Sequence, residues 1–387
     1  MKRRHFLAAG GACLANALRA RPMPPAPPVA IAKCGRYDAT EIHAALKTAF
    51  DQIGGLGRLV KGRTVTIKIN AVQDAARRIG HAPNEETMWT HPLVAGATVS
   101  LMDRAGARRI RVVEGVWHGD GPLEEHLLTA HWDPSLVLGA GSNVTMVNCN
   151  VLGRAKRYPR FTVPGGGMVF PAYDLHPVFE ECDTFVSLTK LKEHITTGVS
   201  LTMKNCFGST PASIYGDSAG EDEPNEYPTL GRNKICHKGS RQPPGSSPRE
   251  IDTSSPRHAG YRIPRIITDL VAARPVDLAI IDGVQGLAMG EGWWVRRARP
   301  VRVGALIAGT NPVCADAVGA SVMGYDPMAD HRTGAFAKRP PHNGAVENMM
   351  ALAAANGLGS HDLRQIEVRG APISEVATEF SRLRETV

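Results

Sequence analysis

Short runs of β-branched and apolar residues alternate with amphipathic segments along most of this chain. Runs of the first kind, bounded by turn residues, are typical of buried strands, and apolar residues at helical spacing are typical of helices. A regular alternation of strands and helices favours a parallel sheet covered by helices. We therefore expect an α/β fold with a mainly parallel, layered sheet flanked by helices. The expected strands are residues 63–69, 109–113, 143–148, 183–188, 276–281, 301–308 and 365–368, and the expected helices are residues 39–53, 91–102, 195–206, 264–273, 312–323 and 343–355.

One long segment interrupts this alternation. Residues 216–260 are rich in proline, glycine, serine and charged residues, and they show almost no apolar periodicity. A loop of this length in a compact domain is usually functional or disordered. We expect a long loop or lid insertion around residues 216–260, with a partner-binding insertion or a disordered segment as alternatives. Residues 29–387 are otherwise expected to form a single α/β domain with its core at about residues 60–330.

Cations concentrate where the central expected strand leads into the next expected helix. Lys190, Lys192 and His194 follow the strand and share one face if the extended backbone continues. Lys204 and Asn205 lie near the end of the helix. The surrounding residues are apolar, and burial of an unpaired charge costs free energy. We therefore interpret this junction as a site that faces an anion.

Polar side chains also follow other expected strands, at the carboxyl end of each. They are Asn70, Glu114 with His118, Asp282 through Glu291, and Asn311 with Asp316. In open parallel sheets, ligands bind outside the carboxyl ends of the strands, where helix N-termini favour anions. Because several separate segments direct polar groups to one edge, we expect the functional site at that edge.

Each candidate at this edge has an expected role. The lysines are expected to hold the anion, the imidazole to transfer a proton or bind a metal, and the carboxylates to act as base or metal ligands. The expected ligand-binding residues are Lys68, Asn70, Lys190, Lys192, Lys204 and Asn205; the expected catalytic residues are His194, Asp282 and Asp316; and the expected metal ligands are His194, Asp282 and Glu291.

Structural roles explain several of these residues as well. The stem of Lys68 can run along a sheet edge with its charge in water, and Asn70 can cap a turn. Lys204 and Asn205 can neutralise a helix C-terminus, and Asp282 can be an ordinary turn aspartate. The sequence leaves these alternatives open.

Familiar cofactor and catalytic motifs are absent from the sequence. The glycine-rich segment 282–292 does not form G-x-G-x-x-G at the start of a helix, and no Walker lysine, G-x-S-x-G or H-E-x-x-H motif occurs. The cysteines that follow the N-terminal segment contain no C-x-x-C pair, so there is no ferredoxin-type iron–sulfur motif. The cofactor stays unknown, and a metal ion or a phosphate-bearing cofactor fits the expected site.

The N-terminus is typical of a twin-arginine export signal. Lys2, Arg3 and Arg4 precede a weakly hydrophobic stretch rich in glycine and alanine, and Ala15-Asn16-Ala17 provides a small-x-small cleavage site. A proline-rich spacer extends this segment to residue 28. We therefore expect residues 1–28 to engage the twin-arginine translocase and the mature protein to be periplasmic.

Composition narrows the classes of partner. The net charge is +8 and is partly concentrated at the N-terminus, and aromatic residues make up 5% of the chain without alternating with basic ones. This pattern does not favour nucleic-acid binding. Nothing after the signal is long and apolar enough to span a membrane. An anionic small molecule is the expected partner.

Five blocks of sequence resemble the domain of unknown function 362 family. They are VTIKIN at 65–70, the His91-Pro92 helix, SLTKLKEH…LTMKNCFGSTP at 187–211, DLAIIDGVQGLAMGEG at 277–292, and AGTNPVCADAVGASVMGYDP at 308–327. Thr189 and Cys206 replace the proline and leucine usual in that family. Many members carry a ferredoxin-like iron–sulfur segment, which this chain lacks. A distant analogy is the lactate racemase family, which uses a nickel pincer nucleotide held by lysine and histidine.

Two functions follow from these observations. The first is an exported enzyme that binds an anionic small molecule or a phosphate-bearing or metal cofactor at the strand carboxyl edge. The second is a periplasmic binding or accessory protein that uses the same basic pocket without chemistry. Asp282 or Asp316 within reach of the imidazole of His194 would favour the first, and a purely cationic pocket would favour the second.

Overall fold

The computed structural model describes residues 26–71, 74–116, 121–229, 231–337 and 345–382. Residues 1–25, which contain the expected twin-arginine signal, lie outside the described residues, as does His118. Export of the protein therefore stays a prediction.

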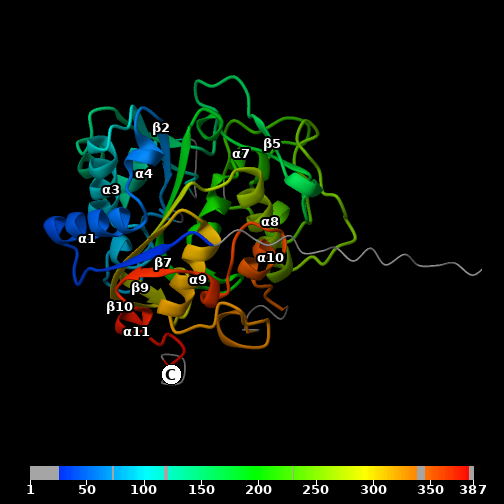
Figure 1. The fold of residues 1–387 in the computed structure, drawn as a ribbon. Coiled ribbons are helices and arrows are strands. Elements are labelled where there is room, and N and C mark those ends of the chain that lie inside the picture. Colours follow the sequence, from blue (N-terminus) through cyan, green and yellow to red (C-terminus); the bar gives the residue numbers. More distant parts are fainter. Residues whose placement is uncertain (1–25, 72–73, 117–120, 230, 338–344, 383–387) are drawn as a thin grey trace, which may run out of the picture.

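A nine-stranded sheet forms the centre of the protein (Figure 1). Its strand order is β11-β1-β10-β9-β7-β2-β3-β4, and β8 pairs with the end of β7. The strands β9, β7, β2, β3 and β4 are parallel to one another, whereas β10 runs antiparallel to both of its neighbours. The strands are β1 Val29–Lys33, β2 Thr64–Lys68, β3 Arg109–Glu114, β4 Val144–Asn148, β7 Thr184–His194, β8 Gly198–Ser200, β9 Leu278–Ala288, β10 Arg299–Gly309 and β11 Val368–Gly370, with β5 Arg160–Thr162 and β6 Ala172–Asp174 as a separate hairpin.

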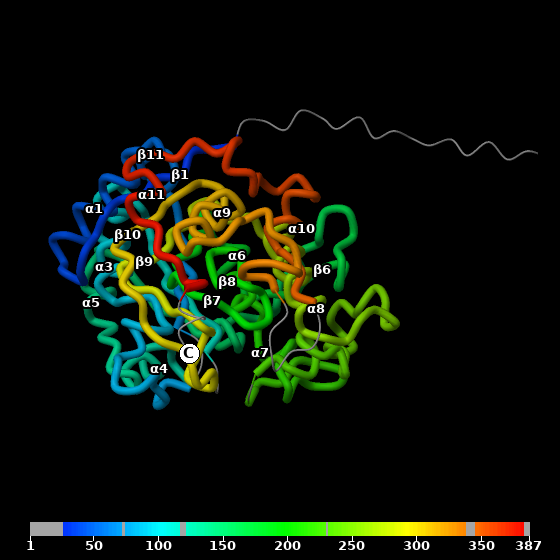
Figure 2. The backbone as a smooth tube through the Cα atoms, turned by 90° about the horizontal axis from the view of Figure 1, so that it is seen from below, coloured from blue at the N-terminus to red at the C-terminus, as the bar shows by residue number. Residues whose placement is uncertain are grey.

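Helices cover both faces of this sheet, which gives the expected layered α/β fold (Figures 1 and 2). Alternate residues of each strand enter two different cores: Val186 and Ile280 pack with α1 and α3, whereas Phe185 and Ile281 pack with α8, α9 and α10. This alternation is what a sheet buried on both faces requires. The α-helices are α1 Ala39–Gln52, α2 Gly57–Val60, α3 Pro92–Arg104, α4 Leu123–Thr129, α5 Ser135–Leu138, α6 Thr202–Asn205, α7 Ala212–Tyr215, α8 Ala259–Ala273, α9 Pro312–Val322, α10 Met349–Ala355 and α11 Ile373–Val376.

Local sequence signals explain the ends of the longer helices. Asp38 caps α1 by accepting hydrogen bonds from the backbone of Thr40 and Glu41, as the sequence suggests. Asn311 caps α9 in the same way, directly before Pro312. None of the helices in the described part of the chain is long and apolar enough to cross a membrane.

The helix expected at 195–206 is wrong over most of its length. Strand β7 continues to His194, the chain turns, and β8 pairs antiparallel with the end of β7. Only the four residues of α6 are α-helical, and a 3-10 turn at Cys206–Ser209 follows. The β-branched residues Thr196, Thr197 and Val199 favour extended backbone, and Gly198 adopts a φ of +74°, which suits a tight turn.

The sheet is also longer than the sequence indicates. Strand β1 was not expected, and it pairs between β10 and β11. The central strands β7 and β9 each run to 11 residues and so extend beyond the sheet edge where the other parallel strands end. The short β11 begins at Val368, the last residue of the strand expected at 365–368.

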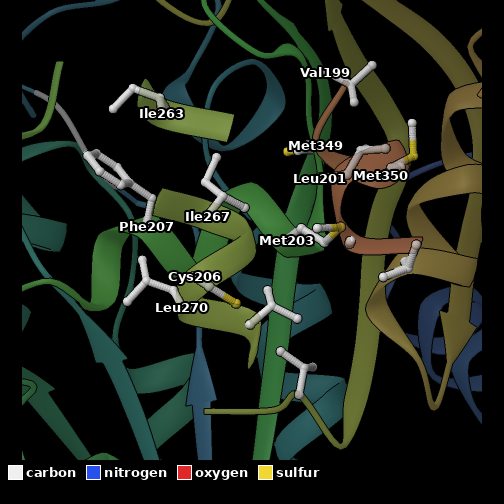
Figure 3. Packing of buried hydrophobic residues seen from close by; sticks show 14 of the residues in the cluster. Val199, Leu201, Met203, Cys206, Phe207, Ile263, Ile267, Leu270, Met349 and Met350 are labelled. Carbon is white, nitrogen blue, oxygen red and sulfur yellow. The ribbon is translucent and has the colours of Figure 1, made fainter. Parts of the chain in front are cut away.

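The segment from α6 to residue 209 is seated on a hydrophobic core. Met203, Cys206 and Phe207 pack with Ile267 of α8 and Met350 of α10 in the same buried cluster (Figure 3). This packing holds the backbone that carries Lys204 and Asn205 in a fixed position against the carboxyl end of the sheet.

The insertion at 216–260 has no strand among its described residues, and its helical turn is Asn233–His237. The buried Arg262 of α8 donates hydrogen bonds to the carbonyls of Ile235 and Cys236, each at 2.9 Å. These bonds anchor the insertion to the domain. The expected long loop is thus confirmed, and part of it forms a wall of the candidate site.

Candidate functional site

A cavity of about 420 Å³ lies at the carboxyl ends of β2, β3 and β7. Its lining comes from these strand ends, from α6 and the turn after it, from the insertion, and from the segment that follows β9. The cavity therefore occupies the edge where the sequence predicts a ligand site. Of the expected ligand-binding residues, the structure brings together Lys68, Asn70, Lys192, Lys204 and Asn205, with the expected catalytic His194 and the expected metal ligand Glu291.

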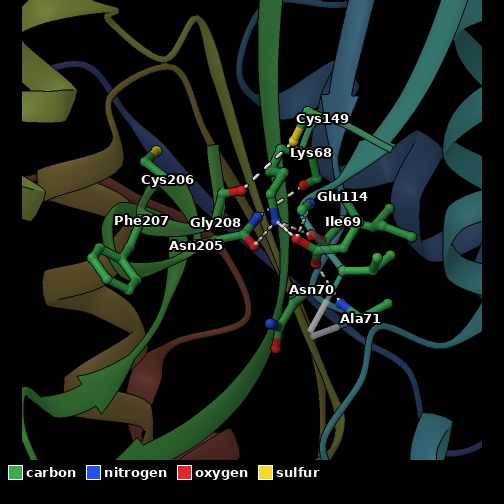
Figure 4. Close-up of polar contacts among 12 residues, drawn as sticks. Lys68, Ile69, Asn70, Ala71, Glu114, Cys149, Asn205, Cys206, Phe207 and Gly208 are labelled. Carbon is green, nitrogen blue, oxygen red and sulfur yellow. Dashed lines mark hydrogen bonds and ion pairs between the residues drawn. The ribbon is translucent and has the colours of Figure 1, made fainter. Parts of the chain in front are cut away.

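An ion pair between Lys68 and Glu114 forms the floor of the cavity (Figure 4). Both side chains are almost completely buried. The Lys68 ammonium also donates to the carbonyl of Ile69 at 2.7 Å and to Oδ1 of Asn205 at 3.3 Å. Glu114 accepts hydrogen bonds from the backbone of Ala71 and Gly115. The floor is thus a neutral, hydrogen-bonded pair, which is the condition for burying two charges.

Close backbone approach fixes the geometry of this floor. A Cβ atom on Gly208 would lie 2.7 Å from Nζ of Lys68 and 2.9 Å from Oε1 of Glu114. Only glycine leaves room for the ion pair under the turn after α6. Asn205 links α6 to the neighbouring strands β2 and β7. Its side-chain amide donates to the carbonyl of Lys68 at 2.8 Å and to Oγ of Ser187 at 3.1 Å.

Asn70 has an unpaired amide group beside this floor. Its side chain is 6% exposed and lines the cavity, and its Oδ1 atom has no hydrogen-bond partner among the described residues. A buried polar atom without a partner costs about 1–3 kcal/mol. Such an atom at a cavity wall indicates a position where a bound molecule completes the hydrogen bonding.

Two lysines, one on β7 and one on α6, contribute positive charge to the cavity. Nζ of Lys192 donates to the carbonyl of Met88 at 2.8 Å. Nζ of Lys204 lies 4.7 Å from the centre of the Phe207 ring. In the described part of the chain neither ammonium is paired with a carboxylate by an ion pair or a hydrogen bond. Burial lowers the pKa of Lys192 to about 7 and that of Lys204 to about 8. Repulsion from Lys204 contributes to the low pKa of Lys192, and repulsion from Lys68 and Arg232 contributes to that of Lys204.

The insertion adds a third cation and a second imidazole, which the sequence did not point to. Arg232 is buried and donates to the carbonyl of Thr210 and to Oδ1 of Asn150. Nδ1 of His237 lies 3.1 Å from the carbonyl of Arg232. Because a carbonyl only accepts, Nδ1 carries the proton, and Nε2 is the acceptor of this ring. Burial lowers the pKa of His237 to about 4, so the imidazole is neutral at neutral pH.

His194 presents the opposite tautomer. The backbone N–H of Thr196 donates to Nδ1 of His194 at 3.1 Å, so the neutral ring carries its proton on Nε2. The carboxylate of Glu291 lies 4.0 Å from the same Nδ1 and accepts a hydrogen bond from the backbone of Ile195 at 2.9 Å. Burial raises the pKa of Glu291. The cavity therefore holds an imidazole donor, an imidazole acceptor and a carboxylate.

Two expected site residues, Lys190 and Asp282, form a separate buried cluster. Nζ of Lys190 lies 2.8 Å from Oδ2 of Asp282 and 2.6 Å from the hydroxyl of Tyr37, and it donates to the carbonyl of Glu85. Asp282 also accepts from the backbone of His91 at 3.0 Å. Neither Lys190 nor Asp282 lines the cavity. Their charges are paired with each other, and the expected ligand contact and catalytic role are therefore not part of our proposal below.

Asp316 likewise lies outside the cavity and supports it from behind. Its carboxylate accepts hydrogen bonds from the backbone of Thr202 at 2.8 Å and of Met203 at 2.9 Å. It thus binds the first residues of α6, the turn that carries Lys204 and Asn205. Burial raises the pKa of Asp316 to about 7. We interpret Asp316 as a positioning residue.

The three expected metal ligands do not form one cluster, although His194 and Glu291 line the same cavity. Within the ranges that the structure describes, no group of three or more histidine, cysteine, aspartate and glutamate side chains could hold a metal ion. Asp282 is bound to Lys190 instead of approaching His194 and Glu291. We therefore assign no metal ligands and route no step through a metal.

The fold and the cavity define an α/β protein with a cationic cavity at the carboxyl edge of its sheet. The chain belongs to the family described as "Domain of unknown function (DUF362)", whose model matches residues 65–321. This finding confirms the family resemblance seen in the sequence.

Two individual proteins show more distant similarity. The "Thylakoid-associated protein sll1697" of Synechocystis sp. is 23% identical over 284 residues, which cover 67% of this chain and 79% of that protein. A crystal structure of a protein from Thermotoga maritima matches 46% of this chain and 39% of its own chain at 13% identity, with a TM-score of 0.30. A score that low carries no argument, and neither protein's description gives an activity.

Proposed function

We propose that this protein is an enzyme that binds an anionic small molecule, or a phosphate-bearing cofactor, in the cavity at the carboxyl edge of its sheet. The observation that carries the proposal is a surplus of cations at this cavity, of which Lys192 and Arg232 are buried and Lys204 is half-buried. Lys192, Lys204 and Arg232 line the cavity, and none of them forms an ion pair with a carboxylate within the described ranges. Burial of unpaired positive charge is costly, and an anion bound between these groups offsets that cost.

The unpaired amide oxygen of Asn70 indicates that the ligand also carries a hydrogen-bond donor. A ligand oxygen can accept from its Nδ2 group, and a ligand hydroxyl can donate to its buried Oδ1 atom. Lys68 and Glu114 neutralise each other, so the floor positions the ligand, and the net attraction for an anion comes from the other cations.

Proton transfer is the chemistry that the imidazoles support. His194 offers a proton on Nε2 and His237 offers an acceptor nitrogen, and both rings line the same cavity. Nε2 of His237 can take a proton from one atom of the ligand and return it to another atom, while the Nε2–H of neutral His194 donates a hydrogen bond to the negative charge that develops on the ligand. We propose His194 and His237 as the catalytic residues.

A binding protein without chemistry is the second candidate. The sequence alone leaves it open, and the cation surplus fits it equally well. The carboxylate of Glu291 beside His194 favours the enzyme, because a pocket that only holds an anion gains nothing from a negative charge on its wall.

Calorimetry with inorganic phosphate and acetate tests the anion site. We expect both anions to bind and to raise the melting temperature. Lys204→Met should weaken binding by about tenfold to a hundredfold, since a hydrogen bond to a charged group contributes about 1.5–3 kcal/mol. Lys47→Met, which removes an exposed cation that pairs with Asp51, is the matched control and should change nothing. Equal binding by the two variants would overturn the proposal.

Solvent-deuterium incorporation separates the enzyme from the binding protein. A panel of small carboxylates and phosphate esters is incubated with the protein in heavy water, and carbon-bound deuterium is measured by NMR. We expect incorporation for at least one compound, with His237→Gln and His194→Gln abolishing it while anion binding persists. Binding without any exchange across the panel would favour the second candidate.

We also propose that the protein is exported to the periplasm by the twin-arginine translocase. The support is the sequence of the first residues alone, with its paired Arg3 and Arg4. Replacement of both by lysine should leave the unprocessed chain in the cytoplasm in a cell-fractionation experiment. Periplasmic protein from the lysine variant would contradict this route.

A further inference from the structure

Two tryptophans stand at the mouth of the cavity. Trp293 and Trp294 both line it, yet their exposed fractions are 39% and 41%. The floor residues Lys68 and Glu114 are almost completely buried, so the cavity runs from a polar floor to an aromatic mouth. Large aromatic side chains usually bury most of their surface. Two adjacent exposed indoles at a cavity mouth therefore need an explanation.

The indoles are held in place by polar contacts. Nε1 of Trp294 donates to Oε1 of Glu291 at 3.3 Å, and the guanidinium of Arg77 lies 5.1 Å from the centre of the Trp293 ring. The two rings meet edge to face, with centroids 5.8 Å apart and an interplanar angle of 85°. The exposed ring surface is thus presented in a fixed orientation, which reduces the entropic cost of contact with a ligand.

The size of the cavity also exceeds that of a simple oxyanion. A volume of about 420 Å³ falls in the range of sites that enclose a small organic molecule, whereas one water in the liquid occupies about 30 Å³. An anionic group bound by Lys192, Lys204 and Arg232 leaves room for the rest of its molecule toward the mouth.

We propose that the ligand is an oxyanion joined to a planar aromatic ring, with the oxyanion held by the cavity cations and the ring stacked on Trp293 or Trp294. The inference rests on the proposed anion site and adds the substrate class. Planar rings stack on indole faces with little dependence on their substituents, and the stacking adds to the charge interaction deeper in the cavity. Phosphate and carboxylate are both oxyanions, and matched probes distinguish them.

Two matched pairs of probes test this inference by calorimetry: methyl phosphate against phenyl phosphate, and acetate against benzoate. We expect the aromatic member of one pair to bind about tenfold more tightly than its aliphatic partner, as one stacked ring typically provides. The pair that shows the larger preference for its aromatic member indicates whether the oxyanion of the ligand is a phosphate or a carboxylate. Quenching of indole fluorescence should accompany binding of the aromatic member.

Variants of the mouth locate the effect. Trp293→Ala and Trp294→Ala, singly and together, should remove the preference for the aromatic probe over the aliphatic one, whereas Trp293→Phe should keep most of that preference. The melting temperature of each variant, measured without a probe, checks that it is folded.

The outcomes separate the two proposals. Equal affinity for both members of each pair would overturn the aromatic-ligand inference and leave the anion site intact. A preference that persists in the double alanine variant would overturn it as well, since the ring would then bind elsewhere. Failure of all four probes to bind would contradict the anion site itself.

Discussion

Two lysines on the same strand have opposite environments. Lys190 and Lys192 both belong to β7 and both are buried, at 0% and 2% exposed. Lys190 is paired with Asp282 and bound by Tyr37 and a backbone carbonyl, whereas Nζ of Lys192 has one backbone acceptor, on Met88. Only Lys192 lines the cavity.

The comparison shows that the strand paired with β7 determines whether a buried lysine on β7 is neutralised by a carboxylate. The pairing of β7 with β9 places Lys190 opposite Asp282, and a register shift between Lys190 and Lys192 places Lys192 opposite Leu287. A partner carboxylate makes the first lysine part of the fold. The lack of one in the described chain makes the second available for a ligand.

Removal of the paired lysine should have the largest effect. Lys190→Met leaves the carboxylate of Asp282 buried without its cation, so we expect a loss of about 3–5 kcal/mol in the free energy of unfolding, measured with urea. The double variant Lys190→Met with Asp282→Leu should lose less than the sum of the single variants. Additive losses would show that the pair is not coupled and would remove the basis of the comparison.

Removal of the cavity lysine should act on binding instead. Lys192→Met is expected to weaken phosphate or acetate binding about tenfold to a hundredfold. Its effect on the free energy of unfolding should be smaller than about 1 kcal/mol, because relief of the buried charge opposes loss of the hydrogen bond to Met88. Calorimetry and urea unfolding on the same sample measure both. A large loss of stability with unchanged anion binding would show that Lys192, like Lys190, has a structural role.

The low pKa values of the cavity lysines predict a pH dependence of stability. Lys192 has a pKa of about 7 when folded and 10.5 ordinarily, so above pH 7 the unfolded chain holds more protons than the folded one. The penalty for burying this charge is therefore full below pH 7 and disappears as pH rises toward 10.5. The difference in unfolding free energy between the protein and Lys192→Met should change over this window.

Anion binding should change with pH in the opposite direction. The ammonium forms of Lys192 and Lys204 are lost in the free protein as pH rises through about 7 and 8, so affinity should fall in that range. Calorimetry with acetate, whose own charge is constant there, measures this. A pH-independent affinity would show that neither lysine holds the anion.

The smallest effect on anion binding is expected behind the cavity. Asp316→Asn keeps an acceptor for one of the two backbone groups of α6 and should cost about 1 kcal/mol in the free energy of unfolding, as loss of a helix cap does. Anion affinity should fall by less than in Lys204→Met, because Lys204 keeps its charge and loses only part of its support. An affinity loss as large as that of Lys204→Met would indicate direct contact of Asp316 with the ligand.

Much of the fold follows from local sequence signals. The alternation of apolar runs and helices predicts the parallel part of the sheet, and caps such as Asp38 and Asn311 mark helix starts. Strand β1 was not predicted, because it directly follows a proline-rich spacer and is stabilised by pairing with β10 and β11. The false helix at 195–206 arose because apolar spacing there fits a helix, whereas the turn at Gly198 depends on pairing with the end of β7.

The candidate site was less predictable than the fold. The positions after strands gave Lys68, Asn70, Lys192, His194 and Glu291, all of which line the cavity. Sequence could not separate Lys192 from Lys190, since the difference lies in the register of β9. Arg232 and His237 were missed because the insertion lacks periodicity, and the only available signal was basic residues in a proline- and glycine-rich segment.

The insertion at 216–260 forms one wall of the cavity and can vary independently of the sheet. It supplies Arg232 and His237 to the cavity, but its described residues contribute no strand to the sheet. Loops exchange more freely than the elements that they connect. We therefore expect a directed-evolution library confined to this segment to change which ligands bind in the cavity while the sheet stays constant.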